Sequence, residues 1–119
     1  MLPGKTPLEA MEMLRAGAIL VDVRERDEIA AAAYDVEALL ILPLSEAQDR
    51  LDEIPRDRPI VWACRSGRRS RQIGEALWAQ GFDNAVNLEG GIIEWARQGL
   101  PVVLHGERQP TGRGAAGGA

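Results

Sequence analysis

Short apolar runs alternate with stretches of helical spacing along most of the chain. Four of these runs are rich in Val, Ile, Leu and Ala and are bounded by charged or turn-forming residues, a pattern typical of strands buried on both faces of a parallel sheet. They occupy residues 18–23, 39–42, 60–63 and 85–88. The stretches that follow them predict helices near residues 25–33, 45–54, 70–80 and 92–98.

A further helix is expected to begin at Thr6. The run Thr6-Pro7-Leu8-Glu9 has the form of a capping box, in which the Thr6 hydroxyl accepts from the Glu9 amide and the Glu9 carboxylate accepts from the Thr6 amide. Pro7 then lies where its missing N–H does no harm. Gly17 follows as a residue suited to a left-handed stop, so the helix should end just before it.

The regular exchange of strands and helices predicts an α/β domain. Parallel neighbours need crossover connections, so this order favours a mainly parallel sheet covered by helices on both faces. With 119 residues, 45% of them hydrophobic, the chain is long enough for one domain with its own core. From residue 106 Gly and Ala dominate. We therefore expect a folded domain over residues 1–105 and a disordered tail over 106–119.

The charge balance argues against nucleic acid or an anionic membrane as a partner. The chain has 18 acidic and 14 basic residues and a formal net charge of -4, which gives no general attraction to a polyanion. Its apolar stretches are far shorter than the roughly 20 residues that span a bilayer, so a soluble cytoplasmic protein is expected. Against this acidic background, four arginines fall within residues 65–71.

The chain has a single cysteine, Cys64, and a single histidine, His105. No internal disulfide can form, and no Cys/His metal cage can be assembled. We therefore expect no metal and no other cofactor. His105 lies at the edge of the predicted tail and is not expected to act as a base.

Cys64 follows a buried-type strand and precedes a polar loop that leads into a helix. At the carboxyl end of a parallel strand, such a loop presents unpaired backbone N–H groups that favour an anion. These dipoles, together with nearby guanidinium groups, stabilise a thiolate, so Cys64 is predicted to be a reactive nucleophile. Gly67 can take a positive φ in the loop. Arg65 and Arg69 could offer planar donor groups to an oxyanion.

A second interpretation treats Cys64 as a small core residue and the arginines as a solvated face. Free cysteine is among the most buried residue types, which favours this interpretation for a cysteine taken alone. The polar loop of Arg, Ser and Gly that follows Cys64 directly favours the nucleophile, since a structural cysteine needs no such neighbours and burying them unpaired would cost several kcal/mol.

Four motifs together resemble the rhodanese family of sulfurtransferases over about residues 6–104. They are the cysteine loop Cys64-Arg65-Ser66-Gly67-Arg68-Arg69-Ser70, the strand end Val21-Asp22-Val23-Arg24-Glu25, the segment Asn87-Leu88-Glu89-Gly90-Gly91-Ile92-Ile93-Glu94-Trp95, and the turn Gly99-Leu100-Pro101-Val102. The resemblance implies a five-stranded parallel sheet flanked by helices. It also implies a thiosulfate sulfurtransferase type of enzyme that carries sulfane sulfur as a cysteine persulfide.

In the roles that the resemblance implies, Cys64 is the catalytic nucleophile. Thiosulfate would donate sulfur and release sulfite, and cyanide or a thiol would accept it; a protein acceptor is also possible. The substrate-binding residues would be those of the loop, whose amides stabilise the outer sulfur in the manner of an oxyanion hole. They are Arg65, Ser66, Gly67, Arg68, Arg69 and Ser70. Arg65 and Arg69 would orient an anionic donor, while Arg68 would point to solvent.

The other candidates have supporting roles. Asp22 and Arg24 could buttress the loop by hydrogen bonds, although an ordinary surface pair fits the sequence equally well. Gly90-Gly91 is interpreted as a tight start to a helix that could also line the pocket rim. The three tryptophans are assigned to the core rather than to ligand stacking. They are Trp62, Trp78 and Trp95.

The sequence departs from the family between the strand end and the next strand. A Gly-His-Ile-Pro-Gly-Ala stretch is usual there, whereas residues 33–38 read Ala-Tyr-Asp-Val-Glu-Ala. This puts the local turn and its packing beside the site in question.

Two other functions are consistent with a cysteine cradle. A phosphatase or arsenate reductase requires Arg six residues after the cysteine, but that position is Ser70 and Arg69 comes one residue earlier. A binding or sulfur-delivery module with a protein partner would share the cradle but show little turnover of its own.

Overall fold

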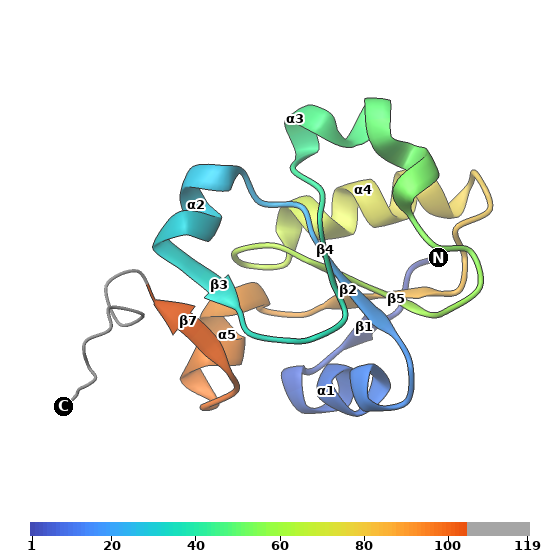
Figure 1. Ribbon diagram of the computed structural model, residues 1–119. Helices are drawn as coiled ribbons and strands as arrows, with labels where there is room; N and C mark the ends of the chain where they lie inside the picture. Colours follow the sequence, from blue (N-terminus) through green and yellow to red (C-terminus); the bar gives the residue numbers. More distant parts are fainter. Residues whose placement is uncertain (105–119) are drawn as a thin grey trace, which may run out of the picture.

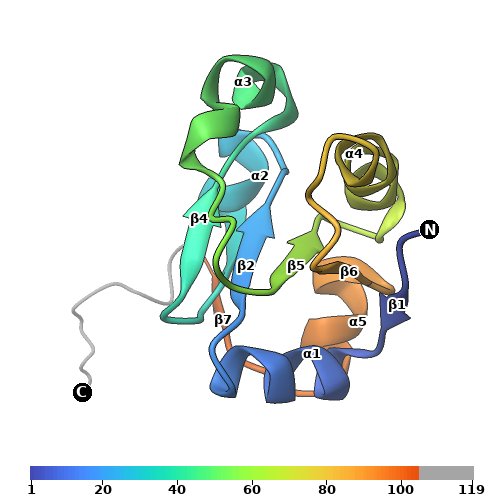
Figure 2. The same cartoon turned by 90° about the vertical axis from the view of Figure 1, so that its right-hand side faces the viewer.

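The computed structural model describes residues 1–104, which form a central parallel sheet with helices on both faces (Figures 1 and 2). The predicted tail and His105 lie outside the described residues. The sheet has the strand order β1-β6-β5-β2-β4, and every neighbouring pair in it is parallel. Its strands are β1 (Gly4–Lys5), β2 (Ile19–Asp22), β4 (Leu39–Ile41), β5 (Ile60–Ala63) and β6 (Ala85–Leu88). The predicted α/β fold with five parallel strands is confirmed.

The helices divide the core into two layers, one on each face of the sheet. One buried cluster lies under α3, η1 and α4 and includes Val21 and Trp62; the other lies under α1 and α5 and includes Leu20 and Trp95. The two layers lie above and below the sheet in Figure 2. The helices are α1 (Pro7–Arg15), α2 (Arg26–Ala31), α3 (Leu44–Ala47), the 3-10 helix η1 (Gln48–Glu53), α4 (Arg68–Trp78) and α5 (Gly91–Arg97).

The start of α1 follows from local chemistry, as predicted. The Thr6 hydroxyl accepts a hydrogen bond from the Glu9 amide at 3.2 Å, and the Glu9 carboxylate accepts one from the Thr6 amide at 3.0 Å. Pro7 is the first helical residue, and Gly17 has a φ of 114° just after the helix. Both ends of α1 are therefore determined by nearby residues.

The prediction of one helix over residues 45–54 is wrong. A four-residue α-helix, α3, is followed by η1, and Arg50 inside η1 has a non-helical φ of -130°. The Arg50 guanidinium binds the Glu46 and Glu53 carboxylates and the Ile41 carbonyl. These contacts hold Arg50 against the end of β4. Their stabilisation outweighs the backbone hydrogen bonds that a continued α-helix would form.

Two strand pairings were not expected from the pattern. The helix predicted over 25–33 ends at Ala31, and β3 (Ala32–Tyr34) pairs antiparallel with β7 (Val102–Leu104). The two-residue strand β1 pairs with Asn87 and Leu88 of β6. Each of these strands is two or three residues long, too short to show an alternation that could identify it.

Of the three tryptophans assigned to the core, Trp62 and Trp95 are fully buried and Trp78 packs against the α4 side of the core. Within residues 1–104, no helix is both long enough and apolar enough to cross a bilayer.

Candidate active site

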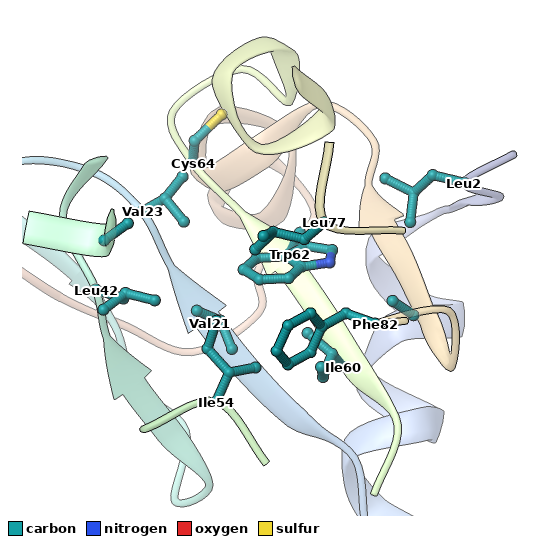
Figure 3. Close-up of a cluster of buried hydrophobic side chains, with 12 residues drawn as sticks. Leu2, Val21, Val23, Leu42, Ile54, Ile60, Trp62, Cys64, Leu77 and Phe82 are labelled. Atoms are coloured by element: carbon teal, nitrogen blue, oxygen red, sulfur yellow. The ribbon is translucent and has the colours of Figure 1, made fainter. Parts of the chain in front are cut away.

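Cys64 comes directly after β5, at the carboxyl end of a central strand of the sheet. The residue is 1% exposed and belongs to the cluster under α4. In Figure 3 its sulfur points away from the core side chains labelled below it. Gly67 then takes a φ of 96° and caps α4, which begins at Arg68. The sulfur therefore lies in the turn that connects a parallel strand to the amino end of a helix, as the sequence predicts.

Three hydrogen-bond donors converge on the Cys64 sulfur. The Gly67 amide lies 3.1 Å from Sγ, the Ser70 amide 3.4 Å, and the Ser70 hydroxyl 3.3 Å. Burial raises the pKa of the Cys64 thiol, but hydrogen bonds from Ser70, Gly67 and the Ser66 amide outweigh it, so the pKa lies below its ordinary value. The loop thus stabilises a thiolate with the Ser70 hydroxyl and with its own backbone amides.

The start of α5 anchors the backbone of the cysteine loop. The Ile92 amide donates to the Cys64 carbonyl at 3.0 Å, and the Ile93 amide donates to the Arg65 carbonyl at 3.3 Å. Gly90 and Gly91 have φ values of 83° and 58°, which permit this tight approach. The interpretation of Gly90-Gly91 as a tight start to a helix is confirmed.

Tyr34 supplies a third anchor, in the segment where the sequence departs from the family. Its hydroxyl donates to the Cys64 carbonyl at 2.7 Å. Burial raises the pKa of Tyr34, so this hydroxyl stays protonated and remains a donor. Residues 32–34 are held by pairing with β7. Although the Gly-His-Ile-Pro-Gly-Ala stretch is missing, Tyr34 therefore holds the Cys64 carbonyl from this segment.

Asp22 and Arg24 form a buried ion pair, so the alternative of a surface pair is wrong. Arg24 Nη2 lies 2.8 Å from Asp22 Oδ2, and both side chains are at most 3% exposed. The Arg24 guanidinium lies 5.4 Å from the centre of the Tyr34 ring. The pair therefore supports the loop through Tyr34, because Tyr34 in turn binds the Cys64 carbonyl.

Asn87, which the sequence analysis did not single out as a site residue, joins the loop to β6. Its Nδ2 donates to the Gly67 carbonyl at 3.0 Å and to Glu89 Oε2 at 3.1 Å, while its Oδ1 accepts from the Ser70 hydroxyl at 2.6 Å. Asn87 is fully buried. A polar residue within a buried apolar strand must find partners, and this is the signal that could have identified it.

The four clustered arginines do not act together. Arg69 forms a double hydrogen bond with the Glu28 carboxylate at 2.7 and 2.8 Å, and Arg71 binds Glu89 and Glu75. Arg65 and Arg68 are exposed and have no hydrogen-bond partner for their side chains among residues 1–104. The hydrogen bond from Arg69 lowers the pKa of Glu28 to about 2. Arg69 was expected to orient an anionic donor. Its guanidinium is instead already paired with the Glu28 carboxylate, which argues against that role.

A cavity of about 300 Å³ lies beside the cysteine loop. Its lining residues are Arg24, Glu28, Ala31, Ala32, Arg65, Ile92 and Ile93. Two of them are tied to the loop, since Arg65 follows Cys64 and the Ile92 amide binds the Cys64 carbonyl. In the described part of the chain, no three His, Cys, Asp or Glu side chains are grouped so that they could hold a metal ion.

The loop geometry also differs from what a phosphatase requires. Ser70, at the sixth position after Cys64, directs its hydroxyl to the sulfur and to Asn87. Arg69 is turned to Glu28. Among residues 1–104, no guanidinium therefore closes the loop around a tetrahedral anion.

Comparison with known proteins identifies the family. Residues 6–98 match the rhodanese family, which is described as "Rhodanese-like domain". The chain belongs to the rhodanese family. This rhodanese domain is 47% identical over 85 residues to a sulfurtransferase of Allochromatium vinosum, covering 71% of the chain and 78% of that protein. It is 34% identical to the thiosulfate sulfurtransferase GlpE of Haemophilus influenzae, covering 82% of the chain and 90% of GlpE.

Solved rhodanese structures share the fold. The crystal structure of a rhodanese-related protein from Thermoplasma volcanium is 30% identical, with a TM-score of 0.75, and the match covers 86% of this chain and 98% of that one. The relatives support an enzyme of the rhodanese type, with sulfur transfer as the general activity.

The Ser70 hydroxyl has one proton for two acceptors, the Cys64 sulfur and Asn87 Oδ1. Asn87 donates both amide protons elsewhere, so its Oδ1 must be the atom that faces Ser70. Because a thiolate is the stronger acceptor, we expect Ser70→Ala to raise the Cys64 pKa, since the variant removes one hydrogen bond to the charged form. The pH dependence of Cys64 alkylation by iodoacetamide, followed by intact mass, measures this value.

A matched control is Ser45→Ala on α3, whose hydroxyl binds Glu25 instead; it should leave the alkylation profile unchanged. A Cys64 pKa in Ser70→Ala equal to or below that of the wild type would show that the Ser70 proton stays on Asn87.

Proposed function

We propose that this protein is a sulfurtransferase that carries sulfane sulfur as a Cys64 persulfide from a donor such as thiosulfate to an acceptor such as cyanide or a thiol. The observation that carries the proposal is the convergence of the Gly67 amide, the Ser70 amide and the Ser70 hydroxyl on Sγ. A sulfur held as a thiolate by fixed dipoles is nucleophilic at neutral pH.

The transfer is balanced in two steps. The Cys64 thiolate attacks the outer sulfur of thiosulfate, a new S–S bond forms, and the electron pair of the broken bond leaves with sulfite. Cyanide then attacks the outer sulfur of the persulfide, forms a carbon–sulfur bond, and releases thiocyanate and the Cys64 thiolate. The loop from Arg65 to Ser70 supports this cycle, since its amide dipoles stabilise negative charge on sulfur in the starting thiolate and in the persulfide.

The remaining candidate residues have defined parts in this proposal. Arg65 is the loop guanidinium that lines the cavity and has no partner within residues 1–104, so it would attract an anionic donor. Arg68 and Ser66 are exposed. Asp22 and Arg24 would act on the loop through Tyr34 rather than by touching the substrate.

Intact mass spectrometry tests the proposal. Incubation with thiosulfate should add one sulfur to the wild-type protein, cyanide should remove it with release of thiocyanate, and Cys64→Ser should gain no sulfur. A protein that gains no sulfur from any donor and whose Cys64 is inert to iodoacetamide at neutral pH would overturn the proposal. Hydrolysis of small aryl phosphates would indicate a phosphatase, and a persulfide discharged only by a protein thiol would indicate a delivery module.

A further inference from the structure

The buried side chain of Asn87 contacts two residues that donate hydrogen bonds to the Cys64 sulfur. Its Nδ2 donates to the Gly67 carbonyl at 3.0 Å, and its Oδ1 lies 2.6 Å from the Ser70 hydroxyl oxygen. Asn87 belongs to β6, which lies next to β5, the strand that Cys64 follows (Figure 2). One side chain from a neighbouring strand therefore reaches the donors on Sγ.

The orientation of the Asn87 amide is fixed by groups that can only accept hydrogen bonds. Nδ2 faces the Gly67 carbonyl and, at 3.1 Å, Glu89 Oε2, which Arg71 also binds at 2.6 Å. Burial raises the pKa of Glu89, but hydrogen bonds from Arg71 and Asn87 outweigh it and keep the pKa below its ordinary value. Glu89 therefore stays a carboxylate, and Oδ1 of Asn87 must be the atom that faces Ser70.

The Ser70 hydroxyl proton can bind only one of its two acceptors at a time. Asn87 Oδ1 has no proton to give, so its 2.6 Å contact with Ser70 Oγ requires the Ser70 proton. When that proton turns to Sγ, 3.3 Å from Oγ, the two oxygens face each other without a proton between them. A thiolate draws the proton, because an ionised acceptor forms the stronger hydrogen bond, whereas an uncharged sulfur is a weak acceptor.

We propose, on the basis of the function proposed above, that Asn87 is a positioning residue that takes the Ser70 proton whenever Sγ is uncharged and thereby favours the persulfide over the free thiolate. In the persulfide the negative charge lies on the outer sulfur and Sγ is uncharged, so the Ser70 hydroxyl returns to Asn87 Oδ1. Sulfite reverses the loading: it attacks the outer sulfur, the Sγ–S bond breaks with its electron pair on Sγ, and thiosulfate leaves. Loss of the Ser70–Asn87 hydrogen bond makes this reversal less favourable.

The decisive variant is Asn87→Leu, which removes the competing acceptor and leaves its neighbours with other partners. The Gly67 carbonyl keeps the Arg71 amide, and the Glu89 carboxylate keeps the Arg71 guanidinium. With Sγ as its remaining acceptor, the Ser70 hydroxyl should stabilise the thiolate more strongly. The Cys64 pKa should therefore fall below that of the wild type, as measured by the pH dependence of alkylation by iodoacetamide.

Two further variants accompany this measurement. Asn87→Val has a smaller side chain that also lacks an acceptor, so it should lower the Cys64 pKa in the same direction. Asn84→Leu changes an exposed asparagine just before β6 and should leave the alkylation profile unchanged.

The other charged and titratable groups that face the cysteine loop are the same in all of these variants. They are Tyr34 and the ion pairs Asp22–Arg24, Glu28–Arg69 and Glu89–Arg71. A fall in the Cys64 pKa is therefore not due to a change of charge nearby.

The equilibrium between thiosulfate and sulfite measures the effect on the persulfide. At fixed thiosulfate, and at a pH above the Cys64 pKa of each variant, intact mass gives the fraction of protein that carries sulfur as sulfite is raised. We expect the sulfite concentration that discharges half of the protein to be about twofold to tenfold lower in Asn87→Leu than in the wild type, the equivalent of one hydrogen bond.

The Ser70→Ala background shows whether Asn87 acts through the Ser70 proton. Without the hydroxyl there is no proton to compete for, so adding Asn87→Leu to Ser70→Ala should change neither the Cys64 pKa nor the sulfite midpoint. A side chain that merely holds the Gly67 carbonyl in place would shift both values in either background.

A measurement on the wild type needs no variant. Asn84 and Asn87 are the two asparagines of the chain, which simplifies assignment of their side-chain carbonyl carbon signals by NMR. The Asn87 signal should move as Cys64 ionises, because the Ser70 proton leaves Oδ1. It should return to its position in the thiol form when Cys64 carries sulfur at the same pH, while the Asn84 signal stays constant.

The outcomes separate the two proposals. A folded Asn87→Leu or Asn87→Val variant whose Cys64 pKa equals or exceeds that of the wild type overturns the inference and leaves sulfur transfer through Cys64 intact. So does an Asn87 carbonyl signal that does not respond to Cys64. A wild type that gains no sulfur from any donor overturns the proposed function, and the alkylation profile still decides whether Asn87 competes for the Ser70 proton. Circular dichroism of each variant confirms that it is folded.

Discussion

Gly91→Ala is expected to destabilise the protein by about 3–5 kcal/mol and to abolish persulfide formation. Gly91 has a φ of 58°, and an added Cβ would overlap the Arg65 carbonyl group and lie 2.6 Å from the Cys64 carbonyl oxygen. Positive φ costs a non-glycine residue about 1–3 kcal/mol, and the backbone atoms in the way cannot rotate aside as a side chain could. The loop that carries Cys64 would have to move, which would also displace the donors on Sγ.

Thermal and urea denaturation measure the stability of Gly91→Ala, and intact mass after thiosulfate measures its persulfide. Gly99→Ala is the matched control, since Gly99 has a φ of 79° but no atom within 4 Å of the added Cβ. It should cost about 1 kcal/mol, the backbone penalty alone. Equal stability of the two variants would show that close approach to the cysteine loop is not the reason for glycine at position 91.

Elements whose cause is local were predictable from the sequence. The strands β5 and β6 have the predicted bounds, because strands buried on both faces of a parallel sheet are short apolar runs, which β5 is throughout and β6 is apart from Asn87. The start of α1 depends on Thr6 and Glu9, which lie three residues apart. The cysteine loop is equally local, since the donors on Sγ come from residues three to six positions after Cys64.

Features that depend on distant partners were not predictable. Glu28 binds Arg69 from 41 residues away, Tyr34 reaches the Cys64 carbonyl across 30, and Asn87 accepts from Ser70 across 17. A sequence shows that Arg69 is a cation near a cysteine, but it does not show that the Arg69 guanidinium is paired with the Glu28 carboxylate. The same limit applies to β3 and β7. Neither short strand has a hydrophobic pattern that identifies it, and each is formed by pairing with the other.

The buried pair of Asp22 and Arg24 shows how far such tertiary contacts determine stability. Arg24→Met would leave the Asp22 carboxylate buried without its guanidinium partner, and removing one member of a buried ion pair costs about 3–5 kcal/mol. A domain of this size has a total stability of about 5–15 kcal/mol, so the variant should unfold at a markedly lower urea concentration. It should also form persulfide more slowly, because Arg24 packs against the Tyr34 ring that anchors Cys64.

Two further variants test whether the stability lost in Arg24→Met comes from the unpaired Asp22 carboxylate. Arg15→Met breaks an exposed pair with Glu12, with side chains 68% and 73% exposed, and should cost less than about 1 kcal/mol. Asp22→Asn/Arg24→Met removes the charge as well as its partner and should recover part of the stability lost in Arg24→Met. Urea midpoints of the three variants measure this order. An Arg24→Met midpoint no lower than that of Arg15→Met would mean that water or another group solvates Asp22, and that the pair does not hold Tyr34 in place.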